Sequence, residues 1–414
     1  LLVGFAYSKS NNDSTDFYLG GRKMGPLVTA MSAEASDMSS WLLMGMPGLA
    51  YLTGIASPGW TAIGLALGTW LNWLIVARRL RRYSANLDAI TVPQFLSLRF
   101  HDQRNLLNAL GAVIIIVFFV PYTASGFAAC GKLFHSLFGV DYMAAMVVSA
   151  CVIVGYTITG GFRAVTTTDL IQSIVMSLAL VAVLVYGIGA AGGWDAVVAN
   201  AQSLPGYLTM MASHNAAEGT ATSYSLLDIV STMAWGLGYF GQPHILVRFM
   251  AASSVNTIPS ARRISMVWMI LCLAGAVAVG FIGIPYFAAH PSGAAAVNAN
   301  AETVFMEITK QLFNPWIAGA LLAAILAAVM STLSCQLLVC SSALTEDIYR
   351  KFLRKNASQI ELVWVGRGMV LLVALIAFLI IVVALVVTVT QAQRRIPVQY
   401  AKRVMGNKMF NGAT

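Results

Sequence analysis

AEASDMSSWLLMG, residues 33–45, is the stretch that decides the fold class, because it places polar side chains inside a long apolar run. It carries two carboxylates, Glu34 and Asp37, and three serines, while the chain on both sides of it is apolar. A charge in a membrane span costs about 2.5–3.5 kcal/mol on insertion scales. If the surroundings are membrane, these acids therefore indicate a site or a partner on another helix.

The composition indicates that the surroundings are membrane. The 414 residues are 58% hydrophobic and 10% charged, whereas soluble domains carry about 25% charged residues. So little charge cannot cover a surface in water, and we expect a lipid bilayer to cover it instead.

The residues that carry chemistry in enzymes do not gather in this sequence. The 5 cysteines lie in apolar stretches, in an odd number and without metal-ligand spacing, and the 5 histidines are scattered, so neither a disulfide framework nor a zinc site is indicated. We find no nucleophile–base spacing, phosphate loop or metal cluster, and we expect neither an enzyme nor a bound cofactor.

Apolar runs of about 20 residues, the length that crosses a bilayer, recur along the chain. We expect spans near residues 27–53, 57–77, 107–133, 142–159, 169–190, 225–250, 264–288, 314–345 and 362–388. Residues 1–7 resemble the end of another span and are too short to cross alone. The sequence therefore predicts an all-α, multi-pass membrane protein.

The positive residues predict the orientation of these spans. If segment 8–26 is cytoplasmic and the sides alternate, the inner segments hold 18 Lys and Arg residues, with Arg248 among them. The outer segments up to residue 380 hold only Lys132 and Lys310. This is the positive-inside bias, and we expect the cell inner membrane with segment 8–26 in the cytoplasm. Because the charges are spread over many loops, they do not indicate nucleic-acid binding.

The small residues around Asp37 indicate a helix that breaks near Ala35 to bind a cation. Unwound carbonyls and hydroxyls are hard oxygen donors, and broken helices of this kind form the sites of secondary transporters. Asp37 could instead make a structural hydrogen bond to a neighbouring helix. Partner hydroxyls occur in AAILAAVMSTLSCQ, residues 323–336, although the same groups suit ordinary helix packing.

A third polar and aromatic stretch is WGLGYFGQPHILVRF, residues 235–249. Its glycines and its proline weaken a helix, and Trp235 and Tyr239 lie one turn apart on a shared face. Aromatic residues in a span often form a lipid belt or pack against other helices. Beside a glycine-rich break, we expect this pair to line a pocket.

Four segments resemble the sodium:solute symporter family, and the resemblance runs from residue 1 to about 380. The segments are FYLGGRKMGPLVTAMSAEASDMSSWLLMG, WGLGYFGQPHILVRFMAA, ARRISMVWMILCLAGAVAVGF and FNPWIAGALLAAILAAVMSTLSCQLLVCSSALTEDIYR. The resemblance implies a LeuT-type fold of two inverted five-helix repeats preceded by one extra helix. It also implies alternating access that couples inward sodium flow to L-proline uptake, with another small solute as the alternative.

The resemblance also implies site residues, matched one by one. Its sodium site would use the main-chain carbonyls of Ala35, Met38 and Ala328 and the hydroxyls of Ser331 and Thr332, with Asp37 as electrostatic support. Proline would lie between Ser39, Ser40 and Trp41 on one side and Tyr122, Trp235 and Tyr239 on the other. The implied residues of a second cation position or of gating are Asp169 and Ser334, with Arg22 at the inner gate or as a plain topology anchor.

Two residues depart from the family motif G-A-S-D-M-S-G, because Glu34 and Ser40 stand where it has glycines. Ser40 narrows the pocket beside the expected substrate. Glu34 adds a carboxylate beside the expected cation site, where it could pair with a polar group on another helix or carry a proton. The sequence leaves these two roles open.

The end of the chain departs from the family as a whole. Nine complete spans follow residue 27 where the fold needs ten, so we expect a bundle truncated at both ends. From Gln391 the chain resembles a cytoplasmic loop of the SecY translocase subunit. We therefore expect a boundary that separates a transporter bundle at 1–380 from a foreign basic tail at 381–414, and a fusion that carries a translocase fragment is the alternative reading.

Overall fold

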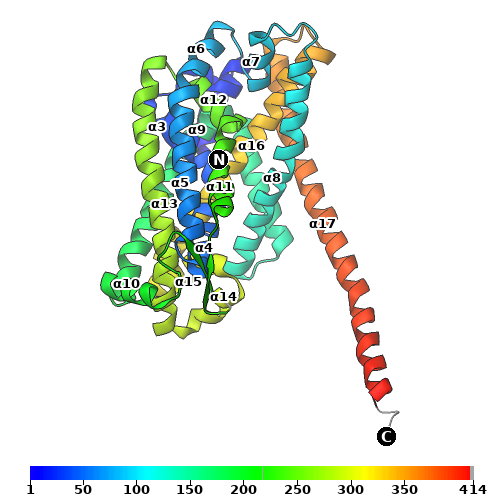
Figure 1. The fold of residues 1–414 in the computed structure, drawn as a ribbon. Helices are drawn as coiled ribbons and strands as arrows, with labels where there is room; N and C mark the ends of the chain where they lie inside the picture. The colour runs from blue at the N-terminus through cyan, green and yellow to red at the C-terminus, as the bar shows by residue number, and fades with distance from the viewer. Residues whose placement is uncertain (217, 411–414) are drawn as a thin grey trace.

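The structure, a computed structural model, describes residues 1–216 and 218–410, and of residues 388–410 only the helical backbone. Nearly all of it is helix (Figure 1). In the first part of the chain the helices are α1 (Leu2–Tyr7), α2 (Ser14–Leu19), α3 (Pro26–Met38), α4 (Gly45–Thr53), α5 (Ala56–Leu71), α6 (Arg78–Asn86), α7 (Val92–Arg99), α8 (Leu106–Phe138) and α9 (Tyr142–Ala190).

The second part of the described chain continues in the same way. Its helices are α10 (Trp194–Ser203), α11 (Leu226–Met233), α12 (Pro243–Ala251), α13 (Ile258–Ala289), α14 (Ala294–Ala299), α15 (Val304–Leu312), α16 (Pro315–Ser342) and α17 (Gln359–Phe410). Short 3₁₀ segments link several helices: η1 (Ser8–Ser10), η2 (Gly20–Arg22), η3 (Ser40–Leu42), η5 (Ala234–Phe240), η6 (Val255–Thr257), η7 (Pro291–Gly293) and η8 (Ala301–Thr303). Two π-helical segments, η4 (Asn72–Ala77) and η9 (Ala343–Leu353), extend α5 and α16.

Six helices of the described chain are long and apolar enough to cross a membrane. They are Ala56–Asn86, Leu106–Phe138, Tyr142–Ala190, Val255–Ala289, Pro315–Leu353 and Gln359–Val387. The expected spans 57–77, 107–133 and 264–288 fall inside three of these helices, and the expected span 314–345 begins one residue before a fourth, Pro315–Leu353. The prediction of a multi-pass helical membrane protein is confirmed.

Helix α9 has a kink. Gly161 has a φ of 58° and a ψ of −152°, a backbone conformation that only glycine adopts readily. The kink divides α9 into two arms that contain the expected spans 142–159 and 169–190. Phe17 packs against the kink, so α2 lies beside the point where the two arms of α9 meet.

The first broken helix is α3–η3–α4, which contains the expected span 27–53. The break is at Ser39, whose φ of 46° and ψ of −166° are uncommon for a residue other than glycine. It therefore falls four residues after Ala35, where we expected the chain to unwind. Small side chains let the helix continue to Met38, and Ser39 supplies the break.

The second broken helix is α11–η5–α12, within the expected span 225–250. Its centre is the 3₁₀ segment η5, and Pro243 is the first residue of α12, where its missing N–H costs no hydrogen bond. Gly236 in η5 touches the backbone of α5 so closely that a Cβ there would collide with the Gly64 carbonyl oxygen. The glycines therefore let η5 lie directly against α5.

The segments expected on one side of the membrane meet at one end of the bundle. There Arg22 donates hydrogen bonds to the carbonyl oxygens of Ala89 (2.7 Å) and Met250 (3.0 Å). At the opposite end Lys132 pairs with Glu302 at 3.1 Å. Figure 1 shows α6 and α7 at the first end and α10, α14 and α15 at the other.

The segment 191–224 holds more structure than the sequence indicated. It contains α10 and an antiparallel hairpin of two strands, β1 (Ala212–Asn215) and β2 (Thr220–Ser223). Tyr207 anchors the segment by donating a hydrogen bond to the Ala50 carbonyl oxygen at 2.8 Å. The hairpin lies at the same end of the bundle as α10.

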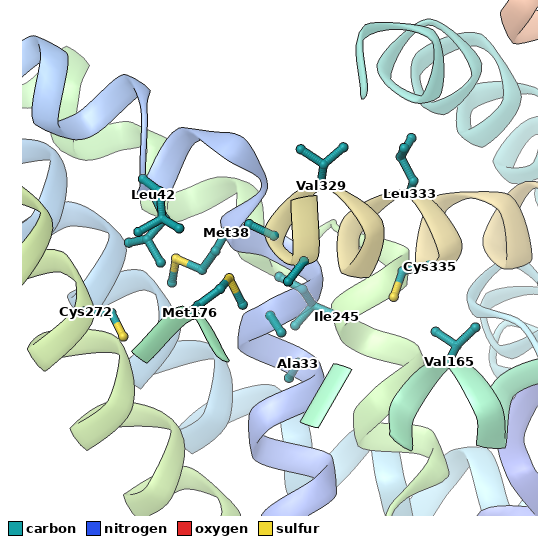
Figure 2. Packing of buried hydrophobic residues seen from close by; sticks show 14 of the residues in the cluster. Ala33, Met38, Leu42, Val165, Met176, Ile245, Cys272, Val329, Leu333 and Cys335 are labelled. Atoms are coloured by element: carbon teal, nitrogen blue, oxygen red, sulfur yellow. The ribbon is translucent and has the colours of Figure 1, made fainter. Parts of the chain in front are cut away.

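Helix α16 lies in the core between α8 on one side and α3 and α9 on the other. Figure 2 shows Val329 and Leu333 pointing to one side of α16 and Cys335 to the opposite side. Because both faces are covered, its hydroxyl-bearing residues have protein neighbours rather than lipid. The polar stretches of α3 and α16 thus meet inside the bundle.

Candidate functional site

The break at Ser39 frees carbonyl groups at the end of α3. The Ser39 N–H donates to the Thr332 hydroxyl of α16 at 3.1 Å, and not to the Ala35 carbonyl four residues earlier. The last carbonyls of any helix lack partners within that helix. Here the Ala35 carbonyl oxygen accepts a hydrogen bond from the Ser331 hydroxyl at 2.7 Å.

The expected sodium ligands gather around this contact. The Ser331 hydroxyl also lies 3.0 Å from the Ala328 carbonyl oxygen, and the Thr332 hydroxyl lies 3.2 Å from that oxygen. Met38, the last residue of α3, is buried beside them. The structure therefore brings together carbonyl and hydroxyl oxygens from α3 and α16, which are hard donors suited to an alkali cation.

Asp37 connects the two broken helices. Its carboxylate accepts a hydrogen bond of 2.5 Å from the Tyr239 hydroxyl in η5. The hydrogen bond to a neighbouring element, one of the two roles considered for Asp37, is thus present. The carboxylate lies one residue from Met38, so its negative charge also acts on the same end of α3.

The expected substrate residues meet around the two breaks. The rings of Trp41 in η3 and Trp235 in η5 lie edge to face, with centroids 4.9 Å apart. Tyr122 of α8 lies near Ser39, and Tyr239 is buried with its hydroxyl on Asp37. The aromatic groups expected on both sides of proline therefore lie in one region.

A cavity of about 490 Å³ reaches this region. Its lining includes Ser40 and Trp41 from the break, and the Lys132–Glu302 ion pair stands at its wall. Of the expected substrate residues, Tyr122, Trp235 and Tyr239 are not among the residues that line it. The cavity connects the break to the end of the bundle where Lys132 lies.

The remaining expected residues lie elsewhere. Ser334 is buried on α16 and donates to the Ser331 carbonyl oxygen at 3.2 Å. Arg22 lies at the opposite end from Lys132, where its guanidinium joins η2 to α6, to the segment after α6 and to α12. The expected role of Arg22, at an inner gate or as a topology anchor, stays a prediction.

Arg248 was counted among the charges of the inner segments, and that prediction was wrong. Its side chain is 1% exposed and lies inside the bundle, with a guanidinium nitrogen 3.4 Å from Asp169. A counter-charge stabilises a buried carboxylate, and Arg248 supplies one for Asp169. The signal was available, since this arginine stands in the apolar run HILVRF within an expected span.

Glu34 is 4% exposed and is held by two other helices. One carboxylate oxygen accepts hydrogen bonds from the Ser265 hydroxyl of α13 and from the Trp73 indole N–H of η4, the second at 3.3 Å. Of the two roles left open for Glu34, pairing with polar groups on other helices is present in the structure.

Comparisons with known families and proteins agree with this geometry. The family model of the sodium:solute symporters matches residues 17–394, past the boundary expected near residue 380. The sodium/proline symporter of Escherichia coli (strain K12) is 54% identical over 379 residues, which are 91% of this chain and 73% of the relative. The high-affinity proline transporter PutP of Bacillus subtilis (strain 168) is 48% identical over 382 residues, covering 92% and 78% of the two chains.

Two solved structures share the fold. A sodium-coupled sialic acid symporter in a substrate-bound outward-open state superposes with a TM-score of 0.80 at 20% identity, over 93% of this chain and 79% of that chain. Mhp1, a nucleobase-cation-symport-1 family transporter in a closed conformation, superposes with a TM-score of 0.52 at 13% identity, over 90% and 74%. The expected LeuT-type architecture is confirmed.

Proposed function

The chain belongs to the sodium:solute symporter family, and on that premise we propose that it couples the inward flow of sodium to the uptake of L-proline. It is a multi-pass membrane transporter and not an enzyme. One relative named a sodium/proline symporter and one named a high-affinity proline transporter share about half of its residues over most of its length. Sodium is the coupling ion in this function.

The observation that supports the proposal best is the contact between Ser331 and Ala35. It joins a helix break in the first half of the bundle to a hydroxyl-bearing helix in the second half. We propose that sodium binds to the carbonyls of Ala35, Met38 and Ala328 and to the hydroxyls of Ser331 and Thr332. In binding, the ion would replace the hydrogen bonds that these oxygens now make with one another.

Asp37 and the aromatic residues extend this proposal to the substrate. The negative charge of Asp37 supports the cation and, through Tyr239, fixes η5 against the end of α3. We propose that proline lies between Ser39, Ser40 and Trp41 and the aromatic groups Tyr122, Trp235 and Tyr239. The apolar ring of proline packs on aromatic faces, its carboxylate binds N–H groups near the break, and its ammonium binds free carbonyls.

Coupling follows if sodium favours the conformation that binds proline. Sodium bound between α3 and α16 holds the broken helix in its substrate-ready form, so proline binds more tightly in its presence. The two repeats then rock to open the site inward. An inward sodium ion gains about 2.3 kcal/mol per 100 mV of membrane potential.

We propose the cell inner membrane as the location, with segment 8–26 in the cytoplasm. One observation supports this orientation. The segments rich in Lys and Arg gather at one end of the bundle, where Arg22 and Arg163 make their contacts, and positive loops remain on the cytoplasmic side. The cavity beside Trp41 then opens outward, as uptake requires.

The test is uptake of labelled L-proline by proteoliposomes with and without an inward sodium gradient. We expect uptake that depends on the gradient and that unlabelled proline competes away. Betaine, sialic acid, a sugar and pantothenate serve as competitors from within the family's range of solutes. Uptake that is independent of sodium would contradict the proposed coupling. Stronger competition by another solute than by proline would identify that solute as the better substrate.

A further inference from the structure

The guanidinium of Arg248 lies in a polar site that is separate from the proposed sodium ligands. Its Nε donates to the Ser32 hydroxyl at 3.0 Å, and one terminal nitrogen donates to the His244 carbonyl oxygen at 2.6 Å. The other terminal nitrogen contacts Asp169 at 3.4 Å and also the Cys335 sulfur. Four elements, α3, α9, α12 and α16, therefore meet at one cation.

The pair of Arg248 and Asp169 is shielded from solvent. Among the ion pairs of the described residues, it is the one in which both side chains are almost wholly buried, at 1% and 0% exposure. The Phe162 ring covers one side, with its centroid 5.3 Å from the guanidinium carbon. Removing one partner of a buried pair leaves an uncompensated charge, which destabilises strongly.

The surroundings of Asp169 have further capacity for a cation. One carboxylate oxygen accepts a hydrogen bond from the Ser32 hydroxyl at 2.6 Å. The other oxygen is buried and has no hydrogen-bond partner among the described residues. Without the guanidinium, a buried carboxylate with a neighbouring hydroxyl would present oxygen donors to a small cation.

This site is one helical turn from the proposed sodium site on the same two helices. On α3, Ser32 precedes Ala35 by three residues, and on α16, Cys335 follows Ser331 by four. The guanidinium thus lies between α3 and α16, one helical turn away from the proposed sodium ligands. Two cations this close would repel each other unless Asp169 neutralised one of them.

We propose that Arg248 is a resident cation that neutralises Asp169 and excludes a second sodium ion from that position. This inference rests on the proposed function, because it gives Arg248 a role beside the proposed sodium site. The charge of Arg248 is part of the protein and stays with it through the transport cycle. The position therefore needs no ion from solution.

The test counts sodium bound to the purified full chain in the absence of proline, using radiolabelled sodium. In Arg248→Gln the carboxylate of Asp169 has no counter-charge, so we expect one more sodium bound per chain than in the unmodified protein. Arg248→Lys keeps the positive charge and is expected to keep the unmodified count. The double variant D169N/R248Q removes both charges and is also expected to return to that count.

The outcomes separate a charge role from a packing role. An unchanged sodium count in a folded Arg248→Gln protein overturns the proposal, as does an additional sodium in D169N/R248Q. If Arg248→Gln does not accumulate in membranes, accumulation of the double variant supports the proposal, because the lone carboxylate is then what the fold cannot accept. Loss of both variants overturns it. Absence of proline uptake by the unmodified protein would contradict the proposed function and leave this comparison of sodium counts valid.

Discussion

The hydroxyl oxygen of Ser331 lies 2.7 Å from the main-chain carbonyl oxygen of Ala35, although 296 residues separate them in the chain. This contact exists because the break at Ser39 ends α3 and α16 is buried beside that end. It gives the proposed sodium site its two sides, and the following predictions start from it.

Ser331→Ala removes one hydroxyl ligand from the proposed sodium site. We expect the sodium concentration for half-maximal proline uptake to rise about tenfold, which corresponds to about 1.4 kcal/mol of binding free energy. Ser342→Ala is the matched control, since this buried serine on α16 bonds, among the described residues, only to the Val339 carbonyl of its own helix. An unchanged sodium requirement in Ser331→Ala would remove this residue from the site.

Asp37→Asn removes the negative charge beside the end of α3. We expect a sodium requirement raised by about tenfold or more, because the proposed cation site loses the negative charge beside it. Tyr239→Phe breaks the 2.5 Å hydrogen bond but keeps that charge, so its effect on the sodium requirement should be smaller. Sodium titrations of proline uptake measure both variants, and transport by Asp37→Asn like that of the unmodified protein would refute our assignment.

Trp235→Ala removes the ring that packs against Trp41. Aromatic pairs contribute about 0.5–1.5 kcal/mol beyond their buried area, so we expect the KM for proline to rise by about tenfold or less. Trp235→Phe should retain most of the affinity. Trp316, which is 90% exposed, provides the control Trp316→Ala, and equal effects at the two tryptophans would argue against a substrate role for Trp235.

Gly236→Ala tests the close contact between η5 and α5. The new Cβ would collide with the carbonyl oxygen of Gly64, so we expect η5 to shift and proline uptake to fall at least tenfold. Gly238→Ala in the same segment has only the end of the Gln242 side chain nearby, at 3.7 Å, and should keep most of the uptake. The measurement is proline uptake per amount of folded protein. Similar losses of uptake in the two variants would contradict the prediction.

Glu34→Leu tests the polar contact among α3, η4 and α13. It leaves the Trp73 N–H and the Ser265 hydroxyl without their acceptor, and a buried unsatisfied group costs about 1–3 kcal/mol. We expect a lower apparent Tm in detergent. Glu34→Gln keeps a carbonyl oxygen that can accept both hydrogen bonds, so its Tm should stay close to that of the unmodified protein. A Tm for Glu34→Leu as high as for Glu34→Gln would show that these bonds stabilise little.

Two features of the candidate site could be predicted from the sequence because their signals are local. The serines and small residues around Asp37 indicated a break in one helix, and the structure places that break at Ser39. The hydroxyls of Ser331 and Thr332 indicated a partner helix, and they contact α3 and α16 carbonyls. The break came four residues later than expected, because small side chains permit unwinding without setting its position.

Hydropathy and charge along the chain were enough to establish a helical membrane protein, since lipid requires long apolar helices whatever their arrangement. Which buried polar groups neutralise one another could not be obtained in that way. Arg248 pairs with Asp169, which is separated from it by 79 positions in the chain. Glu34 accepts a hydrogen bond from Ser265, which is separated from it by 231 positions. Such pairs form only when the helices pack, because the energy of a buried charge depends on its neighbours in space rather than on its neighbours in the chain.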